Sequence, residues 1–237
     1  MYEARLRETV PVVRERLERA AARAGGRAVR LVAVTKGHPA EAVAAAWRLG
    51  LRDCGENRVA ELEAKRAELQ ESDPAADSGV CWHLIGHLQR NKAKRALGLV
   101  GLIHSIDSER LAVALSHEAV QAGRDVEVLL QVNVSGEGSK GGFASEGSVL
   151  EAAARVAALP GLRVNGLMTM APFTADERVL RSTFQGARLL FERCGNEVPG
   201  FSAEHLSMGM SNDFEIAIEE GSTMVRLGTV LFGERQP

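Results

Sequence analysis

One lysine, Lys36, is placed for covalent chemistry at the end of a predicted buried strand. It closes the run Arg-Leu-Val-Ala-Val-Thr-Lys over residues 30–36, and Gly37 and Pro39 interrupt the chain directly after it. A short β-branched run between turn formers predicts a parallel strand. Such a strand brings the amine to the carboxyl edge of a sheet, where α/β folds hold their sites. A partly desolvated amine suits Schiff-base chemistry, and the alternative is a solvated lysine just past the strand.

Two segments rich in small residues near the end of the chain are suited to binding an anion. The first runs from Ser207 through Gly209 to residue 211, and the second contains Gly228 and Thr229 close to Arg226. Small residues let a backbone approach an anion closely, and N–H groups at the start of a following helix would bind it. Each residue taken alone is also an ordinary turn former.

The elements that must position these residues are strands and helices in strict alternation. Strands are predicted to begin near residues 30, 51, 82, 102, 126, 163, 203 and 223, about 28 residues apart, a spacing typical of strand–helix units. Helices are predicted over residues 2–23, 40–49, 57–70, 89–97, 108–122, 145–158, 176–194 and 213–220, with a loop at 73–79. Eight such units in 237 residues predict one (β/α)8 TIM barrel domain spanning residues 1–237. An open doubly wound sheet is the alternative. The apolar stripe Leu6, Val10, Val13 and Leu17 of the extra N-terminal helix is predicted to cap the barrel bottom.

The carboxyl ends of barrel strands form one face, so the polar residues after them converge. Lys36 follows strand one and Asn57 follows strand two, while Met168 ends strand six. Barrels often bind phosphate after strands seven and eight, where the two small-residue segments lie. A Schiff-base lysine facing a phosphate cradle matches pyridoxal 5'-phosphate. His83 points into the barrel by strand alternation, either to contact the cofactor or as a hydrogen-bonded core histidine.

Six motifs in order make the sequence similar to a known family. They are residues 31–36 (LVAVTK), 55–57 (GEN), 82–92 (WHLIGHLQRNK), 166–168 (GLM), 206–211 (LSMGMS) and 221–229 (GSTMVRLGT). The chain resembles the pyridoxal phosphate homeostasis proteins, single-domain relatives of the alanine racemase barrel. The segment 37–39 (GHP) departs from many relatives and leaves the role of the first loop open.

The resemblance implies a fold-type III barrel in which Lys36 holds the cofactor as an aldimine. By the same resemblance, Arg226 faces the pyridine nitrogen and Asn57 lines the pocket. Phosphate contacts are implied for Ser207 with the loop at Gly209, and for Gly228 with Thr229.

The resemblance further implies a protein that carries or buffers pyridoxal phosphate, without robust catalysis of its own. The alternative is a pyridoxal phosphate-dependent amino acid racemase, which would need a tyrosine as second base. The single tyrosine, Tyr2, lies at the N-terminus and is expected to be mobile and out of reach of the site. A purely structural module is a third reading, and Lys36→Ala would separate it from the others. Lys140, in a glycine-rich loop, is a candidate second amine for cofactor loading or, alternatively, a solvated lysine.

Bulk composition restricts the partners. Net charge is −2, which gives no global basic field for nucleic acid or anionic membranes, and the basic run 89–95 is interpreted as a solvated face. Three widely spaced cysteines show neither metal spacing nor a disulfide framework, and the charged N-terminus does not resemble a signal peptide. A cytoplasmic monomer with no membrane segment is expected, with pyridoxal phosphate-dependent apo-enzymes as possible recipients of the cofactor.

Overall fold

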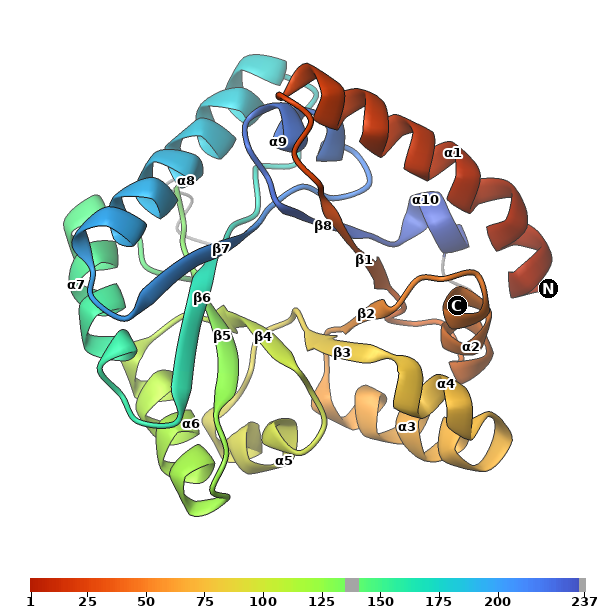
Figure 1. The fold of residues 1–237 in the computed structure, drawn as a ribbon, viewed down its shortest axis with the longest axis horizontal. Helices are drawn as coiled ribbons and strands as arrows, with labels where there is room; N and C mark the ends of the chain where they lie inside the picture. Colours follow the sequence, from red (N-terminus) through yellow and green to blue (C-terminus); the bar gives the residue numbers. More distant parts are fainter. Residues whose placement is uncertain (135–140, 235–237) are drawn as a thin grey trace.

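The computed structural model describes residues 1–134 and 141–234, and its strands form a closed barrel (Figure 1). Eight parallel strands pair in chain order, and the last pairs with the first. They are β1 (Arg30–Val34), β2 (Asp53–Glu56), β3 (Cys81–Leu84), β4 (Leu102–Ile106), β5 (Val126–Gln131), β6 (Leu162–Met168), β7 (Phe201–Ser207) and β8 (Met224–Leu227). The closed order confirms the predicted (β/α)8 barrel and excludes the open sheet.

Helices surround the barrel on its outer side (Figure 1). They are α1 (Tyr2–Arg23), α2 (Ala40–Arg48), α3 (Val59–Ser72), α4 (Pro74–Gly79), η1 (Arg90–Lys92), α5 (Ala93–Leu97), α6 (Glu109–Gln121), α7 (Glu146–Ala157), α8 (Glu177–Glu197), α9 (Phe214–Glu219) and α10 (Thr229–Phe232). Among residues 1–134 and 141–234, none of these helices is long and apolar enough to cross a membrane.

Three sequence predictions about these elements were wrong. The expected loop at 73–79 contains α4, because Pro74 suits a first helical position and the Asp73 side chain accepts a hydrogen bond from the N–H of Ala76. The second strand begins at Asp53 rather than at residue 51. The N-terminal helix does not cap the barrel bottom: α1 lies in the outer ring, where it packs against α2, α9 and α10 (Figure 1).

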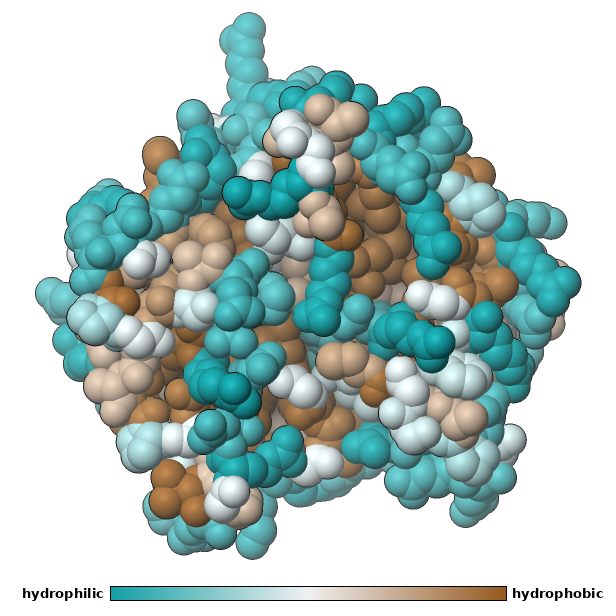
Figure 2. Space-filling view, viewed as in Figure 1, coloured by the Kyte–Doolittle hydropathy of each residue, from teal (hydrophilic) through white to brown (hydrophobic). Residues whose placement is uncertain are grey.

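Strand alternation divides the core into an outer and an inner part. Ala33 and Val225 face the helices and belong to the large outer core. The alternate positions point inward and form a small apolar cluster inside the barrel, consisting of Val32, Leu102, Leu129, Met168 and Met224. In the view down the barrel, hydrophilic side chains cover most of the outer rim, and hydrophobic ones show in the hollows between them (Figure 2).

Candidate functional site

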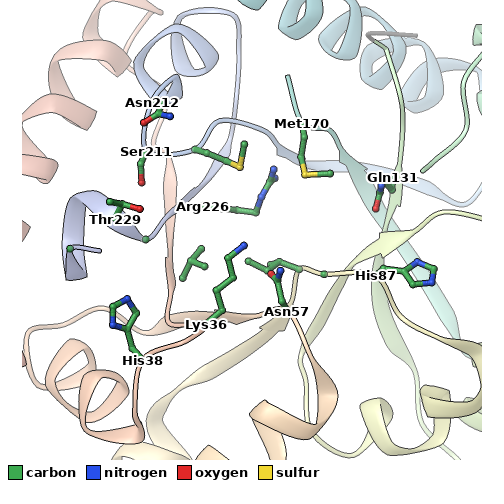
Figure 3. Close-up of a pocket in the computed structure, with 16 residues that line it drawn as sticks. Lys36, His38, Asn57, His87, Gln131, Met170, Ser211, Asn212, Arg226 and Thr229 are labelled. Atoms are coloured by element: carbon green, nitrogen blue, oxygen red, sulfur yellow. The ribbon is translucent and has the colours of Figure 1, made fainter. Parts of the chain in front are cut away.

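A cavity of about 410 Å³ lies at the carboxyl ends of the strands. This volume falls in the range typical of small-molecule sites. Five of the predicted site residues line it: Lys36, Asn57, Arg226, Gly228 and Thr229. Figure 3 shows the Lys36 amine pointing into the cavity from below, toward Arg226 on the far side. The side chains come from the ends of several different strands and from the loops that follow them, which is how a barrel builds a site.

The other four predicted site residues lie outside the cavity lining. Met168 points into the apolar cluster inside the barrel, and Met170, two residues further, lines the cavity instead. Ser207 is fully buried beneath Arg226. His83 is also fully buried inside the barrel, hydrogen-bonded to Asp53 and His104, which is the core-histidine alternative.

Gly209 shapes the loop after β7 without lining the cavity. Its φ of 96° lies in the left-handed region, and a Cβ there would sit 2.7 Å from the Cβ of Ala217. Its carbonyl accepts a hydrogen bond of 3.0 Å from the backbone N–H of Arg226. The residues that follow it, Met210, Ser211 and Asn212, are the ones that reach the cavity.

The Arg226 guanidinium is held rigidly from below. Its Nη1 donates to the carbonyl of Ser207 at 2.8 Å and to the Ser207 hydroxyl at 2.6 Å, and its Nη2 donates to the carbonyl of Thr169 at 2.9 Å. Within the described residues these bonds engage three of the five N–H donors that a guanidinium carries. Burial lowers the pKa of Arg226 to about 10, against the opposing effect of Asp213, so the group stays charged at neutral pH.

Lys36 is positioned by a cluster on the outer side of β1, which we call the anchor cluster and which consists of the buried residues Thr35, Glu56 and Lys65 and the partly exposed Glu61. Lys65 Nζ donates to the Thr35 carbonyl at 2.7 Å, to Glu56 at 2.6 Å and to Glu61 at 2.9 Å. The Thr35 hydroxyl donates to Glu56 at 2.6 Å, and Glu61 accepts from the N–H of Gly37 at 2.6 Å. Both neighbours of Lys36 in the chain are therefore fixed by charged partners.

The two carboxylates of the anchor cluster differ in electrostatics. Burial raises the pKa of Glu56 above its ordinary value, and the opposing effect of Lys65 does not cancel it. One oxygen of Glu56 has no hydrogen-bond partner among the described residues. Burial also acts to raise the pKa of Glu61, but hydrogen bonds from Gly37 and Lys65 outweigh it and leave this pKa below its usual value. Sequence reasoning missed this cluster, although Glu61 and Lys65 stand at helical i, i+4 spacing.

Tyr2 is closer to the site than the sequence suggested. It begins α1, and its hydroxyl lies 3.1 Å from Nδ1 of His38, a buried residue that lines the cavity. The rings of Tyr2 and His38 are 5.6 Å apart edge to face, and Phe232 of α10 contacts both rings. The expectation of a mobile, distant tyrosine was wrong, because aromatic packing orders the first turn of α1. Tyr2 itself does not line the cavity.

Polar groups suited to an anion gather at one end of the cavity. Ser211, Asn212 and Thr229 lie together there, across from Lys36 (Figure 3). The Ser211 hydroxyl accepts from the N–H of Val230 at 3.5 Å, which ties the loop after β7 to α10. The other candidate amine, Lys140, lies outside the described residues.

Comparisons with known proteins agree with this geometry. A family model described as alanine racemase, N-terminal domain, matches residues 11–236. The pyridoxal phosphate homeostasis protein of Aquifex aeolicus is 40% identical over 97% of this chain and 98% of its own length. The chain belongs to the pyridoxal phosphate homeostasis protein family. The Escherichia coli protein of the same name is 39% identical over 94% of each chain.

Solved structures extend the comparison to the bound cofactor. PipY of Synechococcus elongatus, solved with pyridoxal phosphate bound, superposes with a TM-score of 0.83 at 34% identity, covering 96% of this chain and all of its own. Alanine racemase from Corynebacterium glutamicum shares the fold, with a TM-score of 0.73 at 16% identity, but this chain covers only 62% of it.

Proposed function

We propose that this chain binds pyridoxal phosphate in the cavity at Lys36 and acts as a carrier and buffer of the cofactor. The observation that carries the proposal is the placement of a lysine amine and a buried guanidinium on one cavity, with hydroxyl and amide groups at its far end. The lysine amine matches the aldehyde of pyridoxal phosphate, the guanidinium matches its ring nitrogen, and the hydroxyl and amide groups match its phosphate. Bound pyridoxal phosphate supplies an amine-reactive aldehyde and an electron-withdrawing ring. The names of the family members and the cofactor in PipY support this proposal.

Arg226 favours storage of the cofactor over catalysis. It is a charged donor, so next to a pyridine nitrogen it disfavours protonation of that nitrogen. A ring without that proton withdraws electrons less strongly than one paired with a carboxylate. Arg226 therefore restrains the carbanion chemistry that transamination or decarboxylation requires.

Amino acid racemisation is the second candidate function, and the lining gives it little support. A two-base racemase needs a second base facing the lysine, and the described lining residues include no tyrosine. The lining residues with an imidazole side chain, the usual general base of proteins, are His38 and His87. His87 is exposed and bonded to Asp107 at 2.7 Å, so His38 with its Tyr2 partner is the group to test.

The visible absorption spectrum after incubation with pyridoxal phosphate tests the proposal. Wild type is expected to gain a long-wavelength aldimine band that Lys36→Ala lacks, while Lys94→Ala, on the exposed face of α5, keeps it. Addition of L- or D-alanine should leave the chirality of the amino acid unchanged. Absence of the band in wild type would refute cofactor binding, and racemisation lost in His38→Ala would establish the second candidate.

We further propose that the protein works as a monomer and hands its cofactor to pyridoxal phosphate-dependent apo-enzymes. Reactivation of an apo-enzyme by the loaded protein, with the two mixed or separated by a dialysis membrane, distinguishes contact from free diffusion. Equal reactivation in both arrangements would mean that transfer needs no contact.

A further inference from the structure

A chain of buried side chains joins Arg226 to the opposite end of the barrel. The Ser207 hydroxyl, which accepts from Arg226, lies 3.0 Å from Nδ1 of His104. Nε2 of His104 lies 2.9 Å from Nδ1 of His83, and Nε2 of His83 lies 3.0 Å from Oδ1 of Asp53. Ser207 and both histidines are fully buried, and the contacts cross the interior from β8 to β7, β4, β3 and β2.

The two ends of this chain fix the direction of every hydrogen bond in it. The Asp53 carboxylate can only accept, so a neutral His83 donates to it from Nε2 and accepts at Nδ1. Arg226 can only donate, so the Ser207 oxygen accepts from it. A neutral His104 then carries its hydrogen on Nε2, donates to His83, and accepts at Nδ1 from the Ser207 hydroxyl. His83 in turn carries its hydrogen on Nε2 and donates to the carboxylate of Asp53. The structure thus assigns the Nε2–H tautomer to both histidines.

The surroundings keep His104 neutral and the Asp53 carboxylate charged. Burial lowers the pKa of His104 well below its usual value, and nearby His83 and Arg226 lower it further. Burial acts to raise the pKa of Asp53, but effects that include the hydrogen bond from His83 and the charge of Arg30 outweigh it and lower the pKa. Arg30 lies 3.4 Å from Asp53. A cationic Arg226, a neutral His104 and an anionic Asp53 agree with one direction of donation.

We propose that Asp53 is a positioning residue for the cofactor site: through His83, His104 and Ser207 it orients the donors of Arg226 toward the cavity. This inference rests on the proposed function, since it concerns the group that Arg226 faces there. Without an acceptor at Asp53, the His83–His104 pair is free to reverse its tautomers. Nδ1 of His104 would then donate to Ser207, so the Ser207 oxygen would accept two bonds and its own hydrogen would lose its buried acceptor; a turn of this hydroxyl would loosen one of the bonds that orient the guanidinium.

A metal site at the same end is a weaker interpretation of these groups. Ligand atoms of Asp53, Cys81 and His83 lie within 4.8 Å of one another. In the assigned tautomer, however, Nε2 of His83 carries a hydrogen and cannot bind a cation. Burial also raises the pKa of the Cys81 thiol, which disfavours the thiolate that a metal needs.

Histidine ring ¹⁵N NMR of the cofactor-free protein tests the relay directly. Wild type is expected to show His83 and His104 as neutral Nε2–H tautomers at neutral pH, and Asp53→Ala is expected to show exchange between tautomers. Asp125→Ala is the matched control, because it removes an exposed carboxylate just before β5, at the same end of the barrel. Nδ1–H tautomers in wild type, or spectra of Asp53→Ala identical to those of wild type, would overturn the assignment.

Cofactor titration supplies the second readout. Asp53→Ala is expected to weaken pyridoxal phosphate binding roughly fivefold or more and to shift the visible band, whereas Asp125→Ala changes neither. Asp53→Asn keeps an acceptor and should fall between wild type and alanine, and it serves if the alanine variant does not fold. Equal affinities for Asp53→Ala and Asp125→Ala would overturn the coupling. Failure of wild type to bind the cofactor would refute the proposed function, while the NMR result would still decide the tautomers.

Discussion

Replacing Lys65 with methionine should destabilise the protein strongly and in a pH-dependent way. Lys65 is about 5% exposed and bonds to Thr35, Glu56 and Glu61 at 2.6–2.9 Å. Methionine keeps the apolar stem but leaves a buried carboxylate without its cation. Removing one partner of a buried ion pair costs about 3–5 kcal/mol, and we expect about 3 kcal/mol at about pH 8 because Glu56 can take up a proton.

The pH dependence follows from the raised pKa of Glu56. Without Lys65 this pKa rises further, so above the unfolded-state pKa the folded variant binds more protons than its unfolded chain. Its stability therefore falls as pH rises, by up to about 1.4 kcal/mol per pH unit, until the pH passes the folded-state pKa. The loss of unfolding free energy relative to wild type is therefore larger at about pH 8 than at about pH 5.5.

Urea unfolding at both pH values, followed by fluorescence of the buried Trp82, measures this deficit. Lys94→Met is the matched control, since Lys94 is exposed on α5 and its loss should change stability by no more than about 0.5 kcal/mol. A deficit for Lys65→Met below about 1 kcal/mol, or one that does not grow with pH, would refute the reasoning. The variant should also form the aldimine more slowly, because Lys65 fixes the backbone next to Lys36.

Three further variants test other parts of the site. Arg226→Lys should weaken pyridoxal phosphate binding by about tenfold or more in a spectroscopic titration, because an ammonium cannot replace a guanidinium held by several bonds; unchanged affinity would contradict this. Gly86→Ala would place a Cβ 2.4 Å from the carbonyl oxygen of Asn57, so we expect weaker binding together with a lower melting temperature, and a normal melting curve would show that the loop yields freely. Tyr2→Phe should cost about 0.5–1.5 kcal/mol of unfolding free energy through the lost bond to His38, and less than Tyr2→Ala, which also loses the ring packing; equal costs would assign the effect to the hydroxyl alone.

The barrel could be predicted from the sequence because its signals are local. Apolar runs spaced about 28 residues apart dictate strand–helix units, and the strand before Lys36 places its amine at the correct edge. The small residues at Gly228 and Thr229 mark a loop at the cavity for the same reason. Prediction failed at residues 73–79, where proline and aspartate suit a short helix as well as a turn.

The remainder of the site depends on contacts between distant parts of the chain. Tyr2 meets His38 only because α1 packs in the helix ring beside α10, and no local pattern encodes that packing. In the sequence, Lys65 resembles an exposed helix residue. Only the packing of its helix over the strand that carries Glu56 makes it a buried partner of that carboxylate. Strand alternation puts His83 inside the barrel, but its two partners come from β2 and β4.

The unequal interior of the barrel also bears on how the sequence can evolve. In the apolar half, Val32, Leu102 and Leu129 can drift one at a time among hydrophobic residues of similar volume. In the polar half, each side chain donates a hydrogen bond to the next in a fixed direction. A single substitution there leaves a buried donor or acceptor without its partner. Substitutions there should show strong epistasis, and lineages that replace one histidine are expected to have replaced its neighbours as a set.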